Sequence, residues 1–209
     1  MKYFVSGIHT DAGKSYCTGW LARKFMDEGK SVVTQKFIQT GNSGMSEDIE
    51  VHRKLMGTGL LPEDLDHITA PLIFSHPCSP QLAARIDKRD IDLSIIDRST
   101  RILESRYDVV LIEGAGGLLV PITDSYFTAD YVADRKLTLV MVVNGTLGSI
   151  NHAILSFEAV KARNIEMPIV LYNEHFDYDP LISDDTYSFI CRYLKAHFPT
   201  TEIYKVPSL

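Results

Sequence analysis

The chain has 209 residues, of which 45% are hydrophobic, and a formal net charge of −6 at pH 7. A net negative charge argues against a nucleic-acid surface, because such surfaces concentrate basic residues. No stretch approaches the roughly 20 uninterrupted apolar residues of a membrane-spanning helix, and Met1-Lys2 leads directly into a strand-like segment without a secretory signal pattern. We therefore expect one domain over residues 1–209 in the cytoplasm, with neither nucleic acid nor a membrane as partner.

The three cysteines, Cys17, Cys78 and Cys191, are widely spaced and form no CxxC pair. An odd number of cysteines without close spacing favours neither a disulfide framework nor a cysteine zinc site. We interpret them as free thiols of a reducing compartment.

The first informative stretch runs from Lys2 to Ser15 and reads KYFVSGIHTDAGKS. Its β-rich start, the break at Gly7 and the helical pattern after Gly13 predict a strand, a turn and a helix. In that context consecutive backbone N–H groups can surround a phosphate at the helix N-terminus. Gly13 would keep the backbone close to the phosphates, Lys14 would reach the β- and γ-phosphates, and the Ser15 hydroxyl would lie on Mg²⁺.

The spacing within this stretch differs from the general phosphate-loop consensus. Five residues separate Gly7 from Gly13 where the consensus has four, and Ile8 occupies the place of the first glycine. The alternative interpretation is an ordinary strand-to-helix turn that contains an incidental Gly-Lys-Ser sequence.

A β-α-β unit continues from the phosphate loop. Apolar residues at helical spacing predict a helix over about 14–28, which Gly29 ends, and the segment 31–37 predicts a strand. Such a unit predicts a parallel sheet, in which ligands bind beyond the carboxyl ends of the strands. Lys36, Thr40 and Asp48 should lie there, although Asp48 alone could be a carboxylate that stabilises a helix start.

Glu113 begins the second informative stretch, EGAGG at 113–117. The apolar run 108–113 predicts a central parallel strand, and a carboxylate at the end of such a strand can hold Mg²⁺ in phosphate-loop enzymes. The glycines after it would let backbone N–H groups approach a substrate. The alternative is a glycine-rich turn with a solvent-facing Glu113.

The other segments indicate structure more than function. Residues 57–92 show little periodicity beyond a short helix that starts at Pro80, and a helix is predicted over 93–106. Further strands are predicted over 137–143, 167–172 and 202–206, and further helices from near 149 and over 184–197. Ser149 is the expected N-cap of its helix, whose free N–H groups could bind an anion.

The sequence resembles the dethiobiotin synthetase family over nearly its whole length. The matching segments are GIHTDAGKS at 7–15, KFIQTG at 36–41, EGAGGLLVPI at 113–122 and NGTLGSINHAILS at 144–156. The family uses the five-residue spacing of the phosphate loop, and the last two segments in this order are specific to it. The resemblance implies an α/β fold of the P-loop NTPase type, with three layers and a mostly parallel sheet flanked by helices.

The resemblance also implies an activity, in which the family forms the ureido ring of dethiobiotin from diaminopelargonate and CO₂ with ATP and Mg²⁺. A substrate amine takes up CO₂ as a carbamate, a carbamate oxygen attacks the γ-phosphorus, and the second amine closes on the mixed carbamic-phosphoric anhydride. The family is a homodimer whose active sites lie at the subunit interface.

Matching positions imply the site residues. Those implied in catalysis are Lys14, Lys36 and Thr10, and those implied as Mg²⁺ ligands are Ser15, Asp48 and Glu113. Those implied in nucleotide binding are Asp11, Ala12, Gly13, Lys14, Ser15, Tyr16 and Asn173, the last of which would read the adenine edge. Those implied in substrate binding are Thr40, Gly116 and Gly117, and the helix start Gly148, Ser149, Ile150 and Asn151 of the other subunit, with Tyr187 nearby.

At two positions the family resemblance does not assign a role directly. His152 is expected to pack rather than to catalyse, and Phe37 stands where the family usually has proline. The residues after Val206 form a shorter C-terminal stretch than in many relatives, so 207–209 would form only part of the nucleotide pocket.

Two other functions are compatible with a phosphate loop on a parallel sheet. One is a related amide-forming or carboxylating synthetase that acts on another small acid. The other is a nucleotide-switched partition or targeting ATPase. Against the switch, Ile8 and His9 occupy the part of the loop where an extra lysine would stand, and no amphipathic membrane-binding tail follows His197.

Overall fold

The computed structural model describes residues 1–208, and Leu209 lies outside the described residues. Its strands are β1 (Lys2–Gly7), β2 (Val32–Lys36), β3 (Gln39–Thr40), β4 (Ile73–Phe74), β5 (Val109–Gly117), β6 (Thr138–Asn144), β7 (Ile169–Asn173) and β8 (Glu202–Val206). Its helices are α1 (Lys14–Asp27), α2 (Glu47–Met56), α3 (Pro62–Leu65), α4 (Pro80–Asp87), α5 (Leu93–Glu104), α6 (Thr128–Asp134), α7 (Ser149–Ala162), η1 (Glu174–Phe176) and α8 (Pro180–His197). Within residues 1–208, none of these helices combines the length and the apolar character needed to cross a bilayer.

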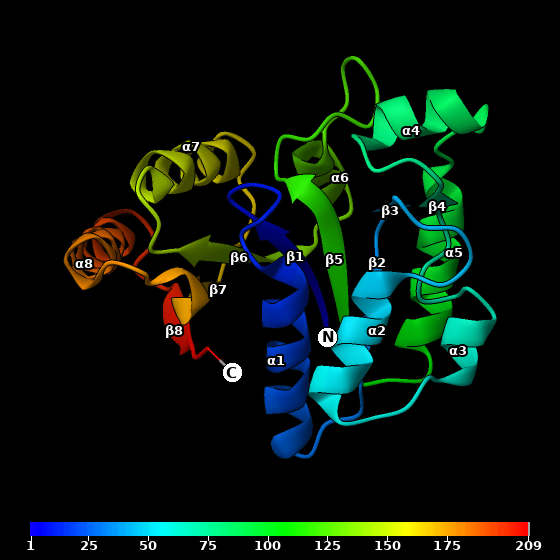
Figure 1. The fold of residues 1–209 in the computed structure, drawn as a ribbon, viewed down its shortest axis with the longest axis horizontal. Coiled ribbons are helices and arrows are strands. Elements are labelled where there is room, and N and C mark those ends of the chain that lie inside the picture. The colour runs from blue at the N-terminus through cyan, green and yellow to red at the C-terminus, as the bar shows by residue number, and fades with distance from the viewer. Residues whose placement is uncertain (209) are drawn as a thin grey trace.

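Six strands form one parallel sheet in the order β2-β5-β1-β6-β7-β8. Helices α1 and α2 lie side by side in front of this sheet, and α7 and α8 pack together beside β6, β7 and β8 (Figure 1). Strands β3 and β4 pair in a separate small sheet. The predicted α/β class with a mostly parallel sheet flanked by helices is confirmed.

The central strands carry much of the hydrophobic core. Residues 109–112 of β5 and 139–143 of β6 are fully buried. A parallel strand that is covered on both faces buries every side chain, which is why these segments read as continuous apolar runs. The first polar residues after each run therefore lie at the carboxyl edge of the sheet, beside the phosphate loop.

Strand β5 extends beyond its predicted end at Glu113 and includes the glycines up to Gly117. Val5 of β1 pairs with Glu113, but Gly7 pairs with Gly117, so the register shifts between these pairs. Lys36 of β2 is the register partner of Glu113 on its other side. Because register partners on neighbouring strands share a face of the sheet, Lys36 and Glu113 project together.

The prediction that Ser149 is an N-cap is wrong by one residue. Gly148 is the N-cap of α7, with φ of 93°, and Ser149 is the first helical residue. The Ser149 hydroxyl instead donates to Oδ1 of Asn144, the residue that ends β6. A left-handed backbone at Gly148 disfavours any other residue there, and the hydroxyl after it finds a partner in the preceding strand.

The prediction for residues 57–92 missed α3 and β4, and α6 was not predicted either. These elements contain between two and seven residues, which is too short for a periodic pattern to develop. Helix α8 starts at Pro180, four residues earlier than predicted, because the Asp179 side chain accepts from the Leu181 and Ile182 N–H groups.

Candidate functional site

A cavity of about 450 Å³ opens where the phosphate loop meets the carboxyl ends of β2 and β5. Eleven of the predicted site residues line it: Thr10, Asp11, Gly13, Lys14, Ser15, Tyr16, Lys36, Thr40, Asp48, Glu113 and Gly116. Ile38, Gln39, Ala115 and Phe176 complete the lining. Segments that lie far apart in the chain therefore meet in one place, as the position of the strand ends predicts.

The phosphate loop holds a cation against its own backbone. Lys14 Nζ donates to the carbonyl oxygens of Thr10, at 2.7 Å, and of His9, at 3.0 Å. Burial lowers the pKa of Lys14 to about 8, although the Glu113 carboxylate acts in the opposite direction. Burial disfavours the charged form of Lys14, and a bound anion would stabilise that charge. The loop is therefore suited to phosphate.

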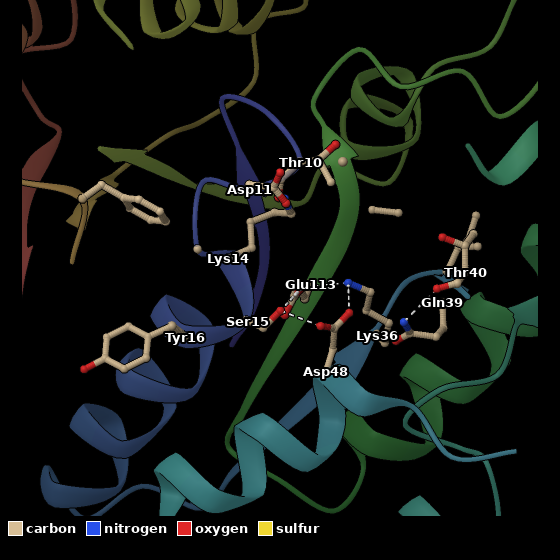
Figure 2. A pocket seen from close by; sticks show the side chains of 15 residues that line it. Thr10, Asp11, Lys14, Ser15, Tyr16, Lys36, Gln39, Thr40, Asp48 and Glu113 are labelled. Carbon is tan, nitrogen blue, oxygen red and sulfur yellow. Dashed lines mark hydrogen bonds and ion pairs between the residues drawn. The ribbon is translucent and has the colours of Figure 1, made fainter. Parts of the chain in front are cut away.

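Two carboxylates, a hydroxyl and an ammonium group form a compact cluster below the loop. Ser15 Oγ donates to Asp48 Oδ1 at 2.7 Å and lies 3.0 Å from Glu113 Oε1. Lys36 Nζ lies 2.6 Å from Asp48 Oδ2 and 2.7 Å from Glu113 Oε1. Figure 2 shows these four side chains pointing toward one another, with Lys14 on the loop to one side and Thr40 to the other.

The cluster decides between the alternatives left open for its two acids. Glu113 is 1% exposed, so it is not the solvent-facing residue of a glycine-rich turn. Burial would raise its pKa, but Lys36 and His52 hold the pKa well below the usual range. Asp48 lies in the first turn of α2, yet its carboxylate reaches the side chains of Ser15 and Lys36.

The charge of Lys36 is similarly fixed by the cluster. Burial alone would lower the pKa of Lys36, but the Glu113 and Asp48 carboxylates outweigh burial and raise the pKa above its ordinary value. The lysine is therefore a permanent ammonium group, buried and aimed at the acids that face the cavity.

The donor atoms of the cluster fit Mg²⁺. Ser15 Oγ, Asp48 Oδ1 and Glu113 Oε1 are hard oxygen donors, and the two contacts of Ser15 measure 2.7 and 3.0 Å. Neighbouring ligands of an octahedral Mg²⁺, each at roughly 2.1 Å from the ion, are about 3 Å apart. Residues 1–208 contain no group of three or more His, Cys, Asp or Glu side chains placed to hold a metal. Phosphate oxygens and water would complete the coordination, as is usual for Mg²⁺.

A second cavity of about 500 Å³ adjoins the first and shares Thr10, Thr40, Ala115 and Gly116 with it. Its remaining lining comes from the segment 77–80 and Val120. The shared wall is polar and the far wall is largely apolar, so the second cavity suits a molecule with a polar end and a hydrocarbon chain.

The structure keeps Asn173 and Ala12 behind the loop rather than in the cavity. Asn173 is 1% exposed, its Nδ2 donates to the Ala12 carbonyl at 3.2 Å, and its Oδ1 accepts from the His175 N–H at 3.2 Å. The amide still has one hydrogen and one lone pair for another partner. In the structure Asn173 braces the phosphate loop against the end of β7.

The remaining predicted substrate residues lie outside the cavity of their own chain. Gly117 pairs with Gly7 at the end of β5, and the helix start 148–151 belongs to α7. The Tyr187 ring packs edge-on against Tyr172, with ring centroids 4.9 Å apart. His152 is exposed and its ring contacts His9 edge-on, with centroids 5.6 Å apart.

Sequence reasoning missed the residue behind Glu113. His52 is fully buried, and its Nε2 lies 2.6 Å from Glu113 Oε2. A signal was present in the sequence, because His52 follows Asp48 by four residues and so lies on the same face of α2. Arg53, Thr34 and Asp64, which continue the contact chain beyond His52, gave no such signal.

Known proteins are similar to this chain in sequence and in fold. The family model described as "AAA domain" matches residues 1–207. ATP-dependent dethiobiotin synthetase BioD 2 of Pasteurella multocida is 44% identical over 199 residues, which are 95% of this chain and 93% of the relative. The chain belongs to the ATP-dependent dethiobiotin synthetase family. The enzyme of the same name from Haemophilus influenzae is 48% identical over 179 residues, 86% of this chain and 94% of that one.

Among solved structures, apo McdA from Cyanthece superposes with a TM-score of 0.56 and 11% identity, covering 100% of this chain and 86% of that one. At this identity the likeness shows the fold alone. The resemblance inferred from the motifs is confirmed by the sequence relatives.

Proposed function

We propose that the protein makes dethiobiotin, ADP and phosphate from diaminopelargonate, CO₂ and ATP. The observation that carries the proposal is the single cavity in which a phosphate loop, two lysines and two acids meet beside a second, partly apolar cavity. Phosphoryl transfer needs positioning and charge neutralisation more than it needs a protein nucleophile. The relatives that share 44–48% of their residues with this chain carry the name of this activity.

The two lysines would act on the group that is transferred. Lys14, whose ammonium lies under the loop backbone, would neutralise the β- and γ-phosphates, and Lys36 would neutralise the carbamate as its oxygen attacks the γ-phosphorus. Thr10 lines both cavities, so its hydroxyl can orient the carbamate relative to the phosphate. The second amine then attacks the carbonyl carbon of the anhydride, closes the ring and releases phosphate.

The acids and Ser15 would hold Mg²⁺ on the nucleotide. When bound, the ion supplies charge neutralisation on the phosphate oxygens. The side-chain oxygens of Asp48 and Glu113 are directed at the Ser15 hydroxyl. In the proposed complex, the acids and the hydroxyl keep the phosphate chain at a fixed distance from Lys36.

The nucleotide would extend from the loop toward η1 and the C-terminal segment. Asp11, Gly13 and Tyr16 line the cavity together with Phe176 of η1, and the Tyr16 hydroxyl donates to the Pro207 carbonyl at 2.9 Å. Asn173 would use its remaining hydrogen and lone pair for the adenine edge. The part of the expected nucleotide pocket formed by Leu209 lies outside the described residues.

The diamine would lie at the boundary of the two cavities. Thr40 and Gly116 belong to that boundary, so the Thr40 hydroxyl and the Gly116 backbone would lie beside the reacting amines, whereas Gly117 stays outside the cavity at the end of β5. The hydrocarbon chain would then extend along the apolar wall.

We propose further that the active unit is a homodimer in which the start of α7 binds the substrate carboxylate in the partner's site. Large apolar side chains are exposed near this helix start: Leu147 is 84% exposed, Leu155 is 59% exposed, and Leu181 on the adjacent α8 is 82% exposed. Clustered exposed leucines are typical of a surface that another chain covers. No side chain caps the first turn of α7. The Ser149 N–H donates to the Thr146 carbonyl at 3.0 Å, so the N–H groups of Ile150 and Asn151 would be the ones to bind an anion.

Sedimentation velocity tests the dimer. The variants Leu147→Glu and Leu155→Glu should shift the protein from dimer to monomer and remove activity, whereas Leu65→Glu should do neither. Leu65 is a matched control because it is 62% exposed but lies on α3. A monomeric wild-type protein with full activity would contradict the dimer proposal.

The activity itself is tested by incubation with diaminopelargonate, isotope-labelled bicarbonate, Mg²⁺ and ATP. Phosphate release should require the diamine, and mass spectrometry should find a product that has gained one labelled carbonyl group and lost two hydrogens. Diamine-independent ATP hydrolysis without this product would favour a nucleotide switch, and labelled product from another diamino acid alone would favour a related synthetase.

A further inference from the structure

A buried polar chain lies behind the acid that faces the nucleotide cavity. The two oxygens of Glu113 point in different directions: Oε1 contacts Lys36 and Ser15 at the cavity, whereas Oε2 lies 2.6 Å from Nε2 of His52 in the interior. His52 is fully buried and belongs to α2, one turn after Asp48. Its ring is therefore placed to fix the orientation of the carboxylate without reaching the cavity itself.

The ring of His52 forms hydrogen bonds on both sides, to Glu113 and to Thr34. Glu113 is ionised beside Lys36 and can only accept, so Nε2 of His52 carries the hydrogen that it donates. The other ring nitrogen, Nδ1, lies 3.0 Å from Thr34 Oγ1, which itself accepts from Arg53 Nη1 at 2.9 Å. The Thr34 hydroxyl oxygen has two lone pairs, so it can accept from Arg53 and still form a hydrogen bond with Nδ1.

The far end of the chain is anchored by an ion pair. Arg53 donates to both oxygens of Asp64, from Nε and from Nη2, each at 2.8 Å. Asp64 also accepts from the Leu61 N–H at 2.8 Å and from Thr69 Oγ1 at 2.7 Å. The segment around α3 thus determines where Arg53 can lie. It also contacts the cavity lining, because the Thr69 carbonyl accepts from the Lys36 N–H at 2.6 Å.

We propose that His52 is a positioning residue for Glu113, which it holds so that one carboxylate oxygen faces Ser15 and the nucleotide-bound Mg²⁺. The inference rests on the proposed ATP-dependent function. Without the ring, Oε2 loses its interior partner and the carboxylate is free to rotate toward Lys36. Removing a group that orients a metal-binding side chain typically weakens metal binding by about 10- to 100-fold.

The test measures how Mg²⁺ changes the binding of a fluorescent ADP analogue, without diamine or bicarbonate. In His52→Leu, the Mg²⁺ concentration for half-maximal effect should rise by about 10- to 100-fold, while binding in EDTA stays at the wild-type level. His52→Gln, which keeps a side-chain N–H donor at similar reach, should recover most of the loss. Thr34→Val, which removes only the hydroxyl behind the ring, should give a smaller shift in the same direction.

Leu103→Ala is the matched control, because it opens a cavity at a fully buried position of α5. Helix α5 contributes no residue to the hydrogen-bonded series from Glu113 to Asp64. It should lower the melting temperature and leave the Mg²⁺ dependence unchanged. An unchanged Mg²⁺ dependence in both His52→Leu and Thr34→Val, or an equal shift in Leu103→Ala, would overturn the inference and leave the proposed function standing. A wild-type protein whose nucleotide binding ignores Mg²⁺ would overturn both.

Discussion

The buried ion pair between Arg53 and Asp64 should contribute measurably to the free energy of unfolding. The Arg53 side chain is 2% exposed and that of Asp64 is fully buried. Asp64→Asn keeps the shape of the side chain but leaves the buried guanidinium without a counter-charge. It also replaces one acceptor oxygen with an NH₂ group, which cannot accept a hydrogen bond. Loss of one partner of a buried pair costs about 3–5 kcal/mol. For a chain of this length, that loss corresponds to a fall of roughly 6–20 °C in melting temperature.

The assay is urea unfolding followed by circular dichroism, with two comparison variants. Asp27→Asn breaks the pair between Arg23 and Asp27, whose side chains are 52% and 60% exposed, and should cost about 0.5 kcal/mol or less. The double change Arg53→Met with Asp64→Leu removes both buried charges and should recover much of the stability. The reasoning is refuted if Asp64→Asn costs no more than Asp27→Asn, or if the double variant is as unstable as the single one.

The same pair predicts a pH dependence. Burial would raise the pKa of Asp64, but the bonds from Arg53, Leu61 and Thr69 outweigh burial and hold the pKa below the ordinary value of 3.8. A depressed pKa contributes stability that is fully present above the unfolded-state value and is lost as the pH falls through the folded-state value. The stability difference between the wild type and Asp64→Asn should therefore be constant near neutral pH and shrink below about pH 4.

Three further changes test the cavity. Lys14→Ala should lower kcat/KM by at least about 100-fold while the protein remains folded by circular dichroism, and near-normal turnover would remove Lys14 from the proposed chemistry. Gly13→Ala should abolish nucleotide binding in a titration, because φ is 84° and the added Cβ would lie 2.1 Å from Asn173 Nδ2; wild-type affinity would show that the loop can yield there. Replacing the substrate carboxylate with an amide should raise KM sharply if residues 148–151 bind it across the dimer, and an unchanged KM would contradict that role.

Much of the fold could be predicted because its long elements have strong local signals. The segments 109–112 and 139–143 are apolar throughout and became buried parallel strands, and the pattern over 14–28 became α1. Short elements such as α3 and β4 could not be predicted, since their conformation depends on contacts made elsewhere. The backbone N–H of Gln39 donates to Leu72 at 2.8 Å, a contact that no local pattern of either segment encodes.

The candidate site divides in the same way. Lys14, Ser15, Lys36, Asp48 and Glu113 could be found because each occupies a motif position next to a predicted strand or helix end, and the structure brings all five together. His52 belongs to no motif. Its position four residues after Asp48 places it on the same face of α2, but only the buried contact with Glu113 reveals its role. A buried polar side chain acquires a role from its partners rather than from its neighbours in sequence.

The sequence by itself determined the phosphate loop, the parallel sheet and the family, because these depend on residue order over short segments and on spacing within motifs. Only the tertiary structure decided how the carboxylate of Glu113 is held, since its partners come from β2, α1 and α2. Their convergence follows from packing α1 and α2 on one side of the sheet beside β2 and β5 (Figure 1). Hydrogen-bond direction, burial and pKa are properties of that packed environment, so they exist only once the chain has folded.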